Sequence, residues 1–254
     1  MRFTKMQGIG NDYVYVNGFA ERIDDPAALS VRVSDRHFGV GSDGLILILP
    51  SERADFRMRM FNADGSEAEM CGNGARCVGR FVYEHGLTKK TCFTLETGGG
   101  IRDIRLNMRG DEIASVTVDM GAPQALEKRA GYTFVSTGNP HAVTFVEFDP
   151  FAWEDFAEKG AKLCAELNAN IEFTQTLSRE KLRMRVWERG SGETLACGTG
   201  ACACAVAAMD AGLCERSVCV QLRGGELRIE WRARDGHILM TGPAVTVFEG
   251  ELND

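Results

Sequence analysis

The sequence predicts a mixed α/β (α+β) fold with two pseudo-symmetric lobes, each a mixed β-sheet or barrel wrapped around a central helix. Three observations predict it. The chain of 254 residues repeats a long segment at about half its length. Strand patterns clearly outnumber helical patterns along the chain. One short helical pattern follows the repeated segment in each half, and the second of these is apolar nearly all round.

The repeat is the most informative of these observations. Residues 56–75 (FRMRMFNADGSEAEMCGNGA) align without gaps on residues 182–201 (LRMRVWERGSGETLACGTGA) at an offset of 126, and eight of the twenty positions are identical. A weaker match at an offset of 128 relates Gly10-Asn11 to Gly138-Asn139. We interpret the two matches as two similar lobes related by a pseudo-twofold axis. Two unrelated strand–turn–helix units are the alternative.

Each copy predicts a strand, a turn and a helix in that order. Residues 56–61 alternate apolar and basic side chains, as a half-buried strand does, and 62–66 carry turn residues. A helix is predicted over 75–85 and ends at Gly86. The second copy predicts a strand over 182–187, a turn over 188–192 and a helix over 201–211 that ends at Gly212. Its small apolar residues predict a helix buried in the middle of its lobe.

The remaining patterns predict further short elements and the division into lobes. Strands are expected over 13–16, 45–49, 91–95, 101–108, 115–120, 142–148, 218–222, 227–231, 238–240 and 245–248, and helices over 22–38 and 153–167. We expect the lobes to join near 119–123. The N-terminal lobe then comprises 1–118, with a last strand within 243–254 returning to it, and the C-terminal lobe comprises 119–242.

Composition and charge argue against several classes of protein. Hydrophobic residues make up 44% and charged residues 26%, as in ordinary globular proteins. The longest apolar run, 45–49, is far shorter than the roughly 20 residues of a membrane span. Residues 1–5 lack the apolar stretch of a signal peptide, so a cytoplasmic protein without membrane contact is expected. A net charge of −7 without a basic block argues against nucleic acid as a partner.

Cys71 and Cys197 differ from the other cysteines in their setting. The nine cysteines show no disulfide-scaffold spacing, and in the cytoplasm most are expected to be reduced. These two each stand between a turn and a helix start, and glycine follows both. The free N–H groups and the positive dipole end of a helix lower a thiol pKa from about 8.5 to roughly 3.5–7.5. The same N–H groups, in Gly72-Asn73 and Gly198-Thr199, can bind a carboxylate.

Two such cysteines that face each other suit proton transfer at an α-carbon. A thiolate on one face removes the proton, and a thiol on the other face returns one, which inverts the stereocentre. The helix N-termini would stabilise the enolate-like charge on the carboxylate. The sequence therefore predicts an amino-acid racemase or epimerase in which Cys71 and Cys197 are the acid and base, and which needs no metal or organic cofactor.

Other interpretations of the cysteines and glycines are weaker. Zinc binding is the main competitor, but no C-x2-C or C-x4-C pair is present, and Cys71 and Cys77 lie about 240° apart around a helix. CGNGA lacks the Lys-Ser/Thr of a phosphate loop. Cys77, Cys202 and Cys204 are predicted core residues. The remaining four indicate no function: Cys92, Cys164, Cys214 and Cys219.

Longer motifs resemble the diaminopimelate epimerase family. They are GIGNDYVYV (8–16), SDRHFGVGSDGLILI (34–48), FNADGSEAEMCGNGARC (61–77), TGNPHAV (137–143), ELNANIEF (166–173), ERGSGETLACGTGA (188–201) and MTG (240–242), and they span essentially the whole chain in order. The resemblance implies the two-lobed fold with the active site in the cleft between the lobes. It also implies interconversion of LL- and meso-2,6-diaminopimelate without pyridoxal phosphate, a step that feeds lysine and cell-wall synthesis.

Carried over residue by residue, the resemblance assigns roles to matching positions. Cys71 and Cys197 are the catalytic acid/base pair, and Gly72, Asn73, Gly198 and Thr199 hold the reacting carboxylate. His141 is expected beside the reacting centre. Six further residues match substrate contacts of the family: Asn11, Asn62, Asn139, Asn168, Glu188 and Arg189. Their chemistry agrees, since Arg189 can pair bidentately with a distal carboxylate and Glu188 with an ammonium group.

The chain departs from the family pattern at one site position. Gly44 stands where some relatives have a Gln that reaches the substrate, and the segment between Gln124 and Thr137 is short. A racemase of the same fold for histidine or proline stays open as an alternative, although the polar set of Asn62, Asn139, Asn168 and Arg189 argues for a second amino-acid head group. A non-catalytic thiol- or metal-binding protein is a further alternative. A homodimer is left open.

Overall fold

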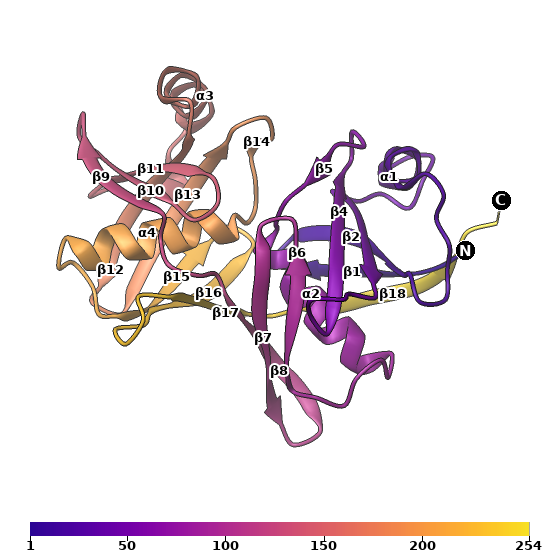
Figure 1. Ribbon diagram of the computed structural model, residues 1–254. Helices are drawn as coiled ribbons and strands as arrows, with labels where there is room; N and C mark the ends of the chain where they lie inside the picture. The colour runs from indigo at the N-terminus through magenta and orange to yellow at the C-terminus, as the bar shows by residue number, and fades with distance from the viewer. Residues whose placement is uncertain (254) are drawn as a thin grey trace. The chain divides into compact units, whose positions relative to one another are not determined.

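The structure is a computed structural model that describes residues 1–253. The chain divides into two compact units, Met1–Val118 with Gly242–Asp254, and Asp119–Thr241. Figure 1 labels most of their helices and strands. The first unit contains β1 (Arg2–Gly8), β2 (Asn11–Asn17), α1 (Pro26–Ser34), β3 (Gly44–Leu49), β4 (Phe56–Asn62), β5 (Glu67–Ala68), α2 (Gly72–Glu84), β6 (Cys92–Thr97), β7 (Gly100–Arg109), β8 (Glu112–Asp119) and β18 (Val245–Glu251).

The second unit repeats this series of elements. It contains β9 (Ala125–Arg129), β10 (Tyr132–Ser136), β11 (Pro140–Phe145), the 3-10 helix η1 (Pro150–Ala152), α3 (Phe156–Leu167), β12 (Asn170–Ser178), β13 (Lys181–Glu188), β14 (Gly192–Glu193), α4 (Gly198–Asp210), β15 (Ser217–Leu222), β16 (Gly225–Trp231) and β17 (Ile238–Gly242).

The two units share one strand order. Neighbouring strands run β18-β1-β2-β3-β4-β6-β7-β8 in the first unit and β9-β10-β11-β12-β13-β15-β16-β17 in the second. In both, only the third pair and the fifth pair along the order are parallel, namely β2/β3, β4/β6, β11/β12 and β13/β15. Parallel neighbours need a crossover connection, and a helix lies in each of the four crossovers. The predicted pseudo-symmetric α/β fold is confirmed.

The strand register repeats as well. Val14 pairs with Leu45 across β2 and β3, and Ala142 pairs with Ile171 across β11 and β12. These two pairs are related by the offsets of 128 and 126 found in the sequence. Each residue on these strands therefore has a structural counterpart in the other unit, which allows the two sites to be compared residue by residue.

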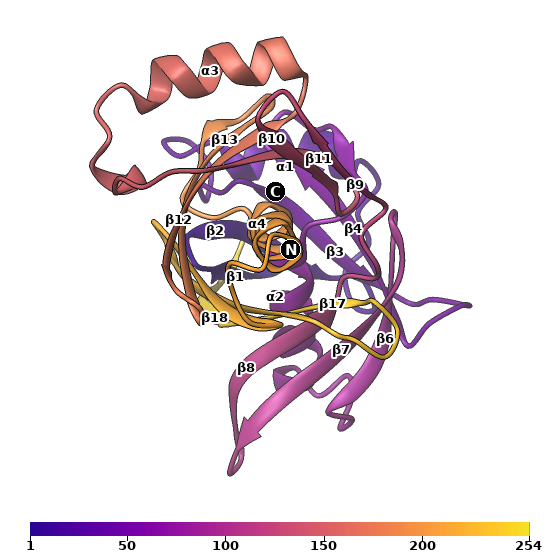
Figure 2. The ribbon, with the colours of Figure 1, turned by 90° about the vertical axis from the view of Figure 1, so that its left-hand side faces the viewer.

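One helix in each unit lies against the curved strands and carries a candidate cysteine at its start. α2 contacts β1, β2, β7 and β18, and α4 contacts β10–β13, β15 and β16. Figure 2 views α4 end-on inside its strands, whereas α3 lies outside them. Every side chain over 201–208 is fully buried, and because these are Ala, Cys and Val the strands can approach closely. The prediction of a buried central helix is confirmed. Among residues 1–253, no helix combines the length and hydropathy that crossing a bilayer requires.

Two helices differ from their predicted lengths. α1 occupies 26–34 rather than 22–38, because Asp25 caps it by accepting the N–H of Ala28 and Pro26 opens its first turn. Asp35 ends it by accepting the N–H groups of His37 and Phe38. α3 begins at Phe156 instead of 153. Trp153 follows η1, and its ring packs edge-on against those of Phe156 and Phe173.

Six strands are absent from the sequence prediction: β1, β5, β9, β10, β12 and β14. β1 and β12 carry polar residues that turn out to be buried, among them Lys5 in β1 and Glu172 in β12. A polar residue breaks an apolar pattern even where a tertiary partner buries it, so periodicity alone does not find such strands. In β1 the partner of Lys5 is Asp12, and in β12 the partner of Glu172 is His141.

Candidate active site

Cys71 is the N-cap residue of α2. Its backbone is extended (φ −133°, ψ 114°), and its Sγ accepts the N–H of Gly74 at 3.3 Å while its carbonyl accepts the N–H of Ala75 at 2.8 Å. A sulfur atom thus occupies the place where Ser, Thr, Asp or Asn oxygens usually cap helices. α2 begins three residues earlier than predicted, at Gly72, because of this cap. The side chain is half-buried.

Cys197 caps α4 in the same way. Its backbone has φ −119° and ψ 106°, and its Sγ accepts the N–H of Gly200, again at 3.3 Å. The Thr199 hydroxyl lies 3.4 Å from the same sulfur. Cys197 is more buried than Cys71, with 5% of its surface exposed. The repeat in the sequence is therefore a repeat of cap geometry.

A bidentate ion pair braces the segment before each cysteine. Arg59 donates to both carboxylate oxygens of Glu67 at 2.8 Å, and Arg185 donates to both oxygens of Glu193 at 2.7 and 3.1 Å. These pairs tie β4 to β5 and β13 to β14, and each short strand leads into its cysteine within four residues. The two pairs explain why Arg59 and Glu67 are repeated as Arg185 and Glu193 in the second copy. Planar two-point pairing also fixes the geometry more firmly than one hydrogen bond does.

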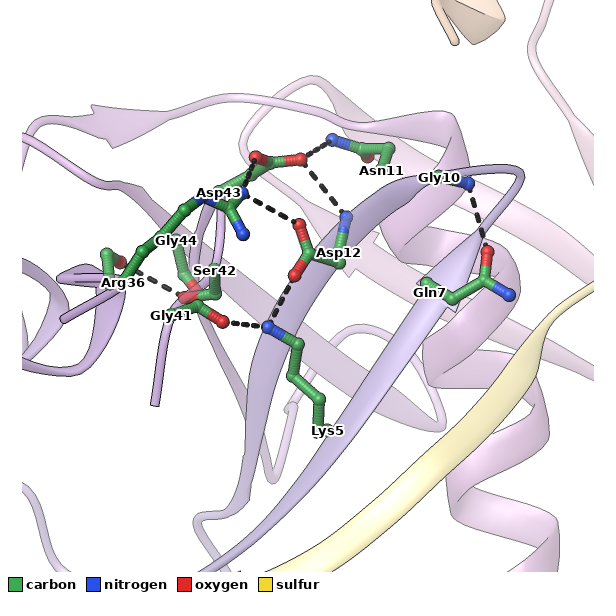
Figure 3. Close-up of polar contacts among 11 residues, drawn as sticks. Lys5, Gln7, Gly10, Asn11, Asp12, Arg36, Gly41, Ser42, Asp43 and Gly44 are labelled. Carbon is green, nitrogen blue, oxygen red and sulfur yellow. Dashed lines mark hydrogen bonds and ion pairs between the residues drawn. The ribbon is translucent and has the colours of Figure 1, made fainter. Parts of the chain in front are cut away.

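Asn11 lies beside Cys71, and its amide orientation is fixed from behind. The thiol of Cys71 donates to Oδ1 of Asn11 at 3.3 Å, and Nδ2 of Asn11 donates to Oδ2 of Asp43 at 2.9 Å. Asp43 also accepts the N–H of Asp12 at 3.1 Å and Nη2 of Arg36 at 3.1 Å. Figure 3 shows this arrangement around Asp43. Because a carboxylate only accepts, the oxygen of Asn11 must face the thiol.

The charged residues around Asp43 form one network. Lys5 is buried, and its Nζ contacts a carboxylate oxygen of Asp12 and donates to the carbonyl of Gly41 (Figure 3). Arg36 bridges Asp12 at 3.3 Å and Asp43 at 3.1 Å. Burial raises the pKa of Asp43 above its ordinary value, and the nearby charge of Asp12 raises it further. Sequence reasoning missed Asp43, although it stands in one of the quoted motifs.

Gly44 has no room for a side chain on this backbone. A Cβ atom there would lie 2.0 Å from the carbonyl oxygen of Phe61 and 2.8 Å from the Tyr13 ring. Real Cβ atoms do not approach other atoms so closely, so a longer residue would require the start of β3 to shift. The glycine is therefore tied to the local path of the chain, and no side chain from position 44 reaches a ligand.

The other predicted residues of the first unit lie close to the α2 cap in sequence. Asn62 ends β4, and its Nδ2 donates to the Ser66 hydroxyl at 3.0 Å across the turn. Gly72 and Asn73 form the first turn of α2, and Asn73 is buried. Their backbone N–H groups are at the positive end of the helix, as the anion-binding prediction requires.

Glu188 joins Cys197 in the second unit. Its carboxylate accepts the Thr194 hydroxyl and a hydrogen bond from the Cys197 thiol. Burial raises the pKa of Glu188 above its ordinary value. Burial also raises the pKa of the Cys197 thiol well above its usual value, and the charges of Glu188 and Glu172 raise it further.

The predicted lowering of the thiol pKa is therefore wrong for Cys197. The N–H of Gly200 does act in the expected direction, and so does the hydroxyl of Thr199, but both effects are smaller than the burial of the sulfur and the two neighbouring carboxylates. In this structure Cys197 is a thiol at neutral pH.

His141 and Asn139 lie together near the start of β11. Nε2 of His141 is 2.9 Å from Oδ1 of Asn139, and Nδ1 is 2.5 Å from Oε1 of Glu172. The sequence analysis identified one ring partner, Asn139, but missed the other, Glu172. The repeat could have revealed Glu172, because at the offset of 126 this glutamate corresponds to Ile46, which lies in an apolar strand.

Asn168 and Arg189 form a second, exposed polar pair. Nη1 of Arg189 donates to Oδ1 of Asn168 at 3.1 Å, and the backbone N–H of Arg189 donates to Oδ1 of Asn170 at 2.8 Å. Asn168 ends α3 in the left-handed conformation (φ 49°), which Asn tolerates better than most residues. Within the second unit, the structure thus brings together Asn139 with His141, Glu188 with Cys197, and Asn168 with Arg189.

Among residues 1–253, no group of three His, Cys, Asp or Glu side chains is arranged to hold a metal ion. Cys77, Cys202 and Cys204 are buried within α2 and α4, so their prediction as core residues is confirmed.

The family model for diaminopimelate epimerase matches residues 3–126 and 133–247. The chain belongs to the diaminopimelate epimerase family. The resemblance stated from the motifs is confirmed, and the unmatched residues 127–132 fall within the segment that the sequence shows to be short. The matched ranges include both cysteine motifs and every other predicted site residue.

Several relatives match the chain over its whole length. Diaminopimelate epimerase of Desulfovibrio desulfuricans is 50% identical, with 99% of this chain and 98% of the relative covered. The Acetivibrio thermocellus enzyme of the same name is also 50% identical, with 100% and 99% covered. That of Methanococcus maripaludis is 48% identical, with complete coverage of both chains.

Solved structures share the fold at low sequence identity. A phenazine biosynthesis protein of the PhzF family from Bacillus anthracis has a TM-score of 0.78 at 18% identity, with 100% of this chain and 99% of that chain covered. A hydroxyproline epimerase from Agrobacterium vitis, with bound trans-4-hydroxy-L-proline, has a TM-score of 0.73 at 17% identity, with 99% and 90% covered. At these identities the likeness shows the fold alone.

Proposed function

We propose that this protein is a cofactor-independent diaminopimelate epimerase that interconverts the LL and meso isomers by proton transfer at one α-carbon. The observation that carries the proposal is the equivalence of Cys71 and Cys197. Each caps the central helix of a unit with the same strand order, and each sulfur accepts an N–H at the same distance. Membership of the family supports the named substrate.

The proposed reaction uses the two sulfurs in sequence. The thiolate of one cysteine takes the α-hydrogen as a proton, which leaves the electron pair of the broken C–H bond to delocalise onto the carboxylate. The thiol of the other cysteine then donates its proton to the opposite face of the carbon and becomes the thiolate. The reverse direction exchanges the two roles. Backbone N–H groups of Gly72, Asn73, Gly198 and Thr199 are the proposed donors to the carboxylate, where negative charge develops.

The Asn168–Arg189 pair is the proposed anchor for the distal head group. A guanidinium can bind a carboxylate through two parallel hydrogen bonds, and the amide of Asn168 is held beside it at 3.1 Å. A substrate with one head group would leave this pair without a partner. For this reason we propose diaminopimelate, rather than proline or histidine, as the substrate.

We also propose a cytoplasmic location and a homodimer. Within the described residues none of the nine cysteines forms a disulfide bond, which suits a reducing compartment. The exposed apolar side chains of Val245, Val247 and Phe248 lie on β18 and are the surface that we propose a second copy covers.

Deuterium incorporation into a panel of amino acids tests the proposed function. Purified protein in D2O, without added cofactor, should label the α-position of diaminopimelate much faster than that of lysine, histidine or proline. A site that is built to hydrogen-bond a missing group can reject the analogue by about 10⁴-fold. Faster labelling of histidine or proline than of diaminopimelate would mean that the family fold serves another substrate. No labelling of any amino acid would sink the proposal of an epimerase.

A further inference from the structure

Glu172 and His141 form a hydrogen-bonded dyad, whereas Ile46 and Tyr13 stand at the equivalent positions of the first unit. We propose that Glu172 is a positioning residue that acts through His141 to fix the amide of Asn139, so that the amide N–H groups are presented to the substrate carboxylate. The role for Asn139 rests on the proposed function. The protonation of the dyad can be measured without any substrate.

The dyad is completely buried. Neither side chain has exposed surface, and Nδ1 of His141 lies 2.5 Å from Oε1 of Glu172. Oε1 also lies against the first turn of α4, since a Cβ added to Gly200 would meet it at 2.9 Å. The positive end of a helix favours a carboxylate at this place. An ionised carboxylate buried here without a cationic partner would cost several kcal/mol, so the proposal pairs an ionised Glu172 with a positive ring at His141.

The hydrogen bonds of the ring lead to the same charge state. His141 contacts an oxygen atom on each side, Oε1 of Glu172 at Nδ1 and Oδ1 of Asn139 at Nε2. An ionised carboxylate and an amide oxygen only accept, so with Glu172 ionised both ring nitrogens donate, and a ring with two N–H groups is an imidazolium. This charge state is part of the proposal. The Asn139 oxygen is then held by the ring, and its Nδ2 group is left to donate in another direction.

In the first unit the equivalent asparagine, Asn11, has the opposite amide orientation. At the offsets of the repeat, Tyr13 stands opposite His141, Ile46 opposite Glu172 and Asn11 opposite Asn139. The local geometry agrees. Gly74 and Gly200 are equivalent in the repeat, and a Cβ added to Gly74 would lie 2.7 Å from the Ile46 side chain, as one added to Gly200 would lie 2.9 Å from that of Glu172.

The two anchors give the two asparagines opposite roles. Asp43 accepts from Nδ2 of Asn11, which turns the Asn11 oxygen toward the Cys71 thiol. The His141 ring donates to Oδ1 of Asn139, which turns its N–H groups outward. In the first unit Asn11 therefore offers an acceptor, and in the second unit Asn139 offers a donor, although the units share one fold.

The charge state of His141 can be observed by nitrogen-15 NMR of histidine-labelled protein. The chain has four histidines, and the His141 signals are identified by their loss in His141→Asn. In the wild-type protein at neutral pH, both ring nitrogens of His141 should carry protons. In Glu172→Gln the negative charge is gone, so the ring should become neutral with one bare nitrogen. A bare nitrogen in the wild-type ring, or a charged ring in Glu172→Gln, would overturn the proposal.

Activity supplies the second readout. Because Glu172→Gln frees the Asn139 amide to turn, one donor to the carboxylate is lost, and kcat for diaminopimelate should fall by roughly 100-fold. Glu172→Ile, which copies the equivalent residue of the first unit, should show a loss at least as large with a folded protein, as judged by its thermal unfolding. The matched control is Glu180→Gln, an exposed glutamate just after β12, which should retain the wild-type kcat and His141 signals.

The outcomes separate the two proposals. Wild-type kcat in folded Glu172→Gln or Glu172→Ile would show that Glu172 positions nothing. If instead the wild-type protein does not epimerise diaminopimelate but His141 is an imidazolium paired with Glu172, the proposed function fails while the dyad remains.

Discussion

Replacing either Cys71 or Cys197 by alanine should abolish the interconversion of LL- and meso-diaminopimelate. Each sulfur is the proposed proton carrier for one face of the α-carbon, and among residues 1–253 no other thiol stands at a helix N-cap. Loss of a positioned acid or base lowers the rate by up to about 10⁴-fold. The fold should survive, since losing the sulfur as an N-cap costs only about 1 kcal/mol. The measurement is the rate of conversion by chiral chromatography, together with the thermal unfolding midpoint.

The matched controls are cysteines of the same two helices. Cys77→Ala in α2 and Cys202→Ala in α4 change fully buried side chains that are not at the cap. Both variants should be less stable than wild type but should keep most of the activity. If Cys71→Ala or Cys197→Ala retained the activity of these controls, the two-sulfur mechanism would be wrong.

Replacing Arg189 by leucine should selectively impair the reaction of diaminopimelate. Arg189 is held by Asn168 and offers the only bidentate donor among the predicted site residues. A hydrogen bond to a charged group contributes about 1.5–3 kcal/mol. On that basis kcat/KM for diaminopimelate should fall by roughly 10- to 150-fold. The α-deuteration of lysine, which has no distal carboxylate, should stay at its low wild-type rate.

Arg179→Leu serves as the control for this prediction. Arg179 pairs with Glu215 at the surface, and that exposed pair contributes little to stability. Unchanged kcat/KM is expected for this variant. If Arg189→Leu left the preference of the enzyme for diaminopimelate over lysine as it was, the distal anchor would have to lie elsewhere.

The repeat made most of the fold predictable from the sequence. It located both cysteine motifs, the strands β4 and β13 and the two central helices, because a repeat constrains structure without requiring any one pattern to be strong. The missed strands show where pattern reasoning fails. β12 carries Glu172, which is as buried as its apolar neighbours because His141 supplies its counter-charge. Such a pairing joins residues 31 positions apart in the chain, and no local pattern reveals it.

The electrostatic prediction failed at Cys197 for a related reason. Helix position could be inferred from the glycines, but burial and the charge of Glu172 come from tertiary structure. Together with Glu188 they keep the proton on the sulfur in this structure. The Cys71 thiol likewise donates a hydrogen bond to Oδ1 of Asn11. The proposed mechanism therefore begins with transfer of the Cys197 proton to the carboxylate of Glu188, which accepts a hydrogen bond from that thiol, and the resulting thiolate then reacts with the α-carbon.

The central claim is tested most directly by measuring how much solvent deuterium enters the α-carbon of the product and of the unreacted substrate at low conversion. LL-diaminopimelate is incubated with the wild-type enzyme in D2O and stopped at low conversion, and the meso product and the unreacted substrate are separated and analysed by mass spectrometry. Two sulfurs on opposite faces predict a product that carries one deuterium at its inverted α-carbon and a remaining substrate that carries almost none. A product that retains the original hydrogen would show that one group removes and returns the same proton, which contradicts the roles assigned to Cys71 and Cys197.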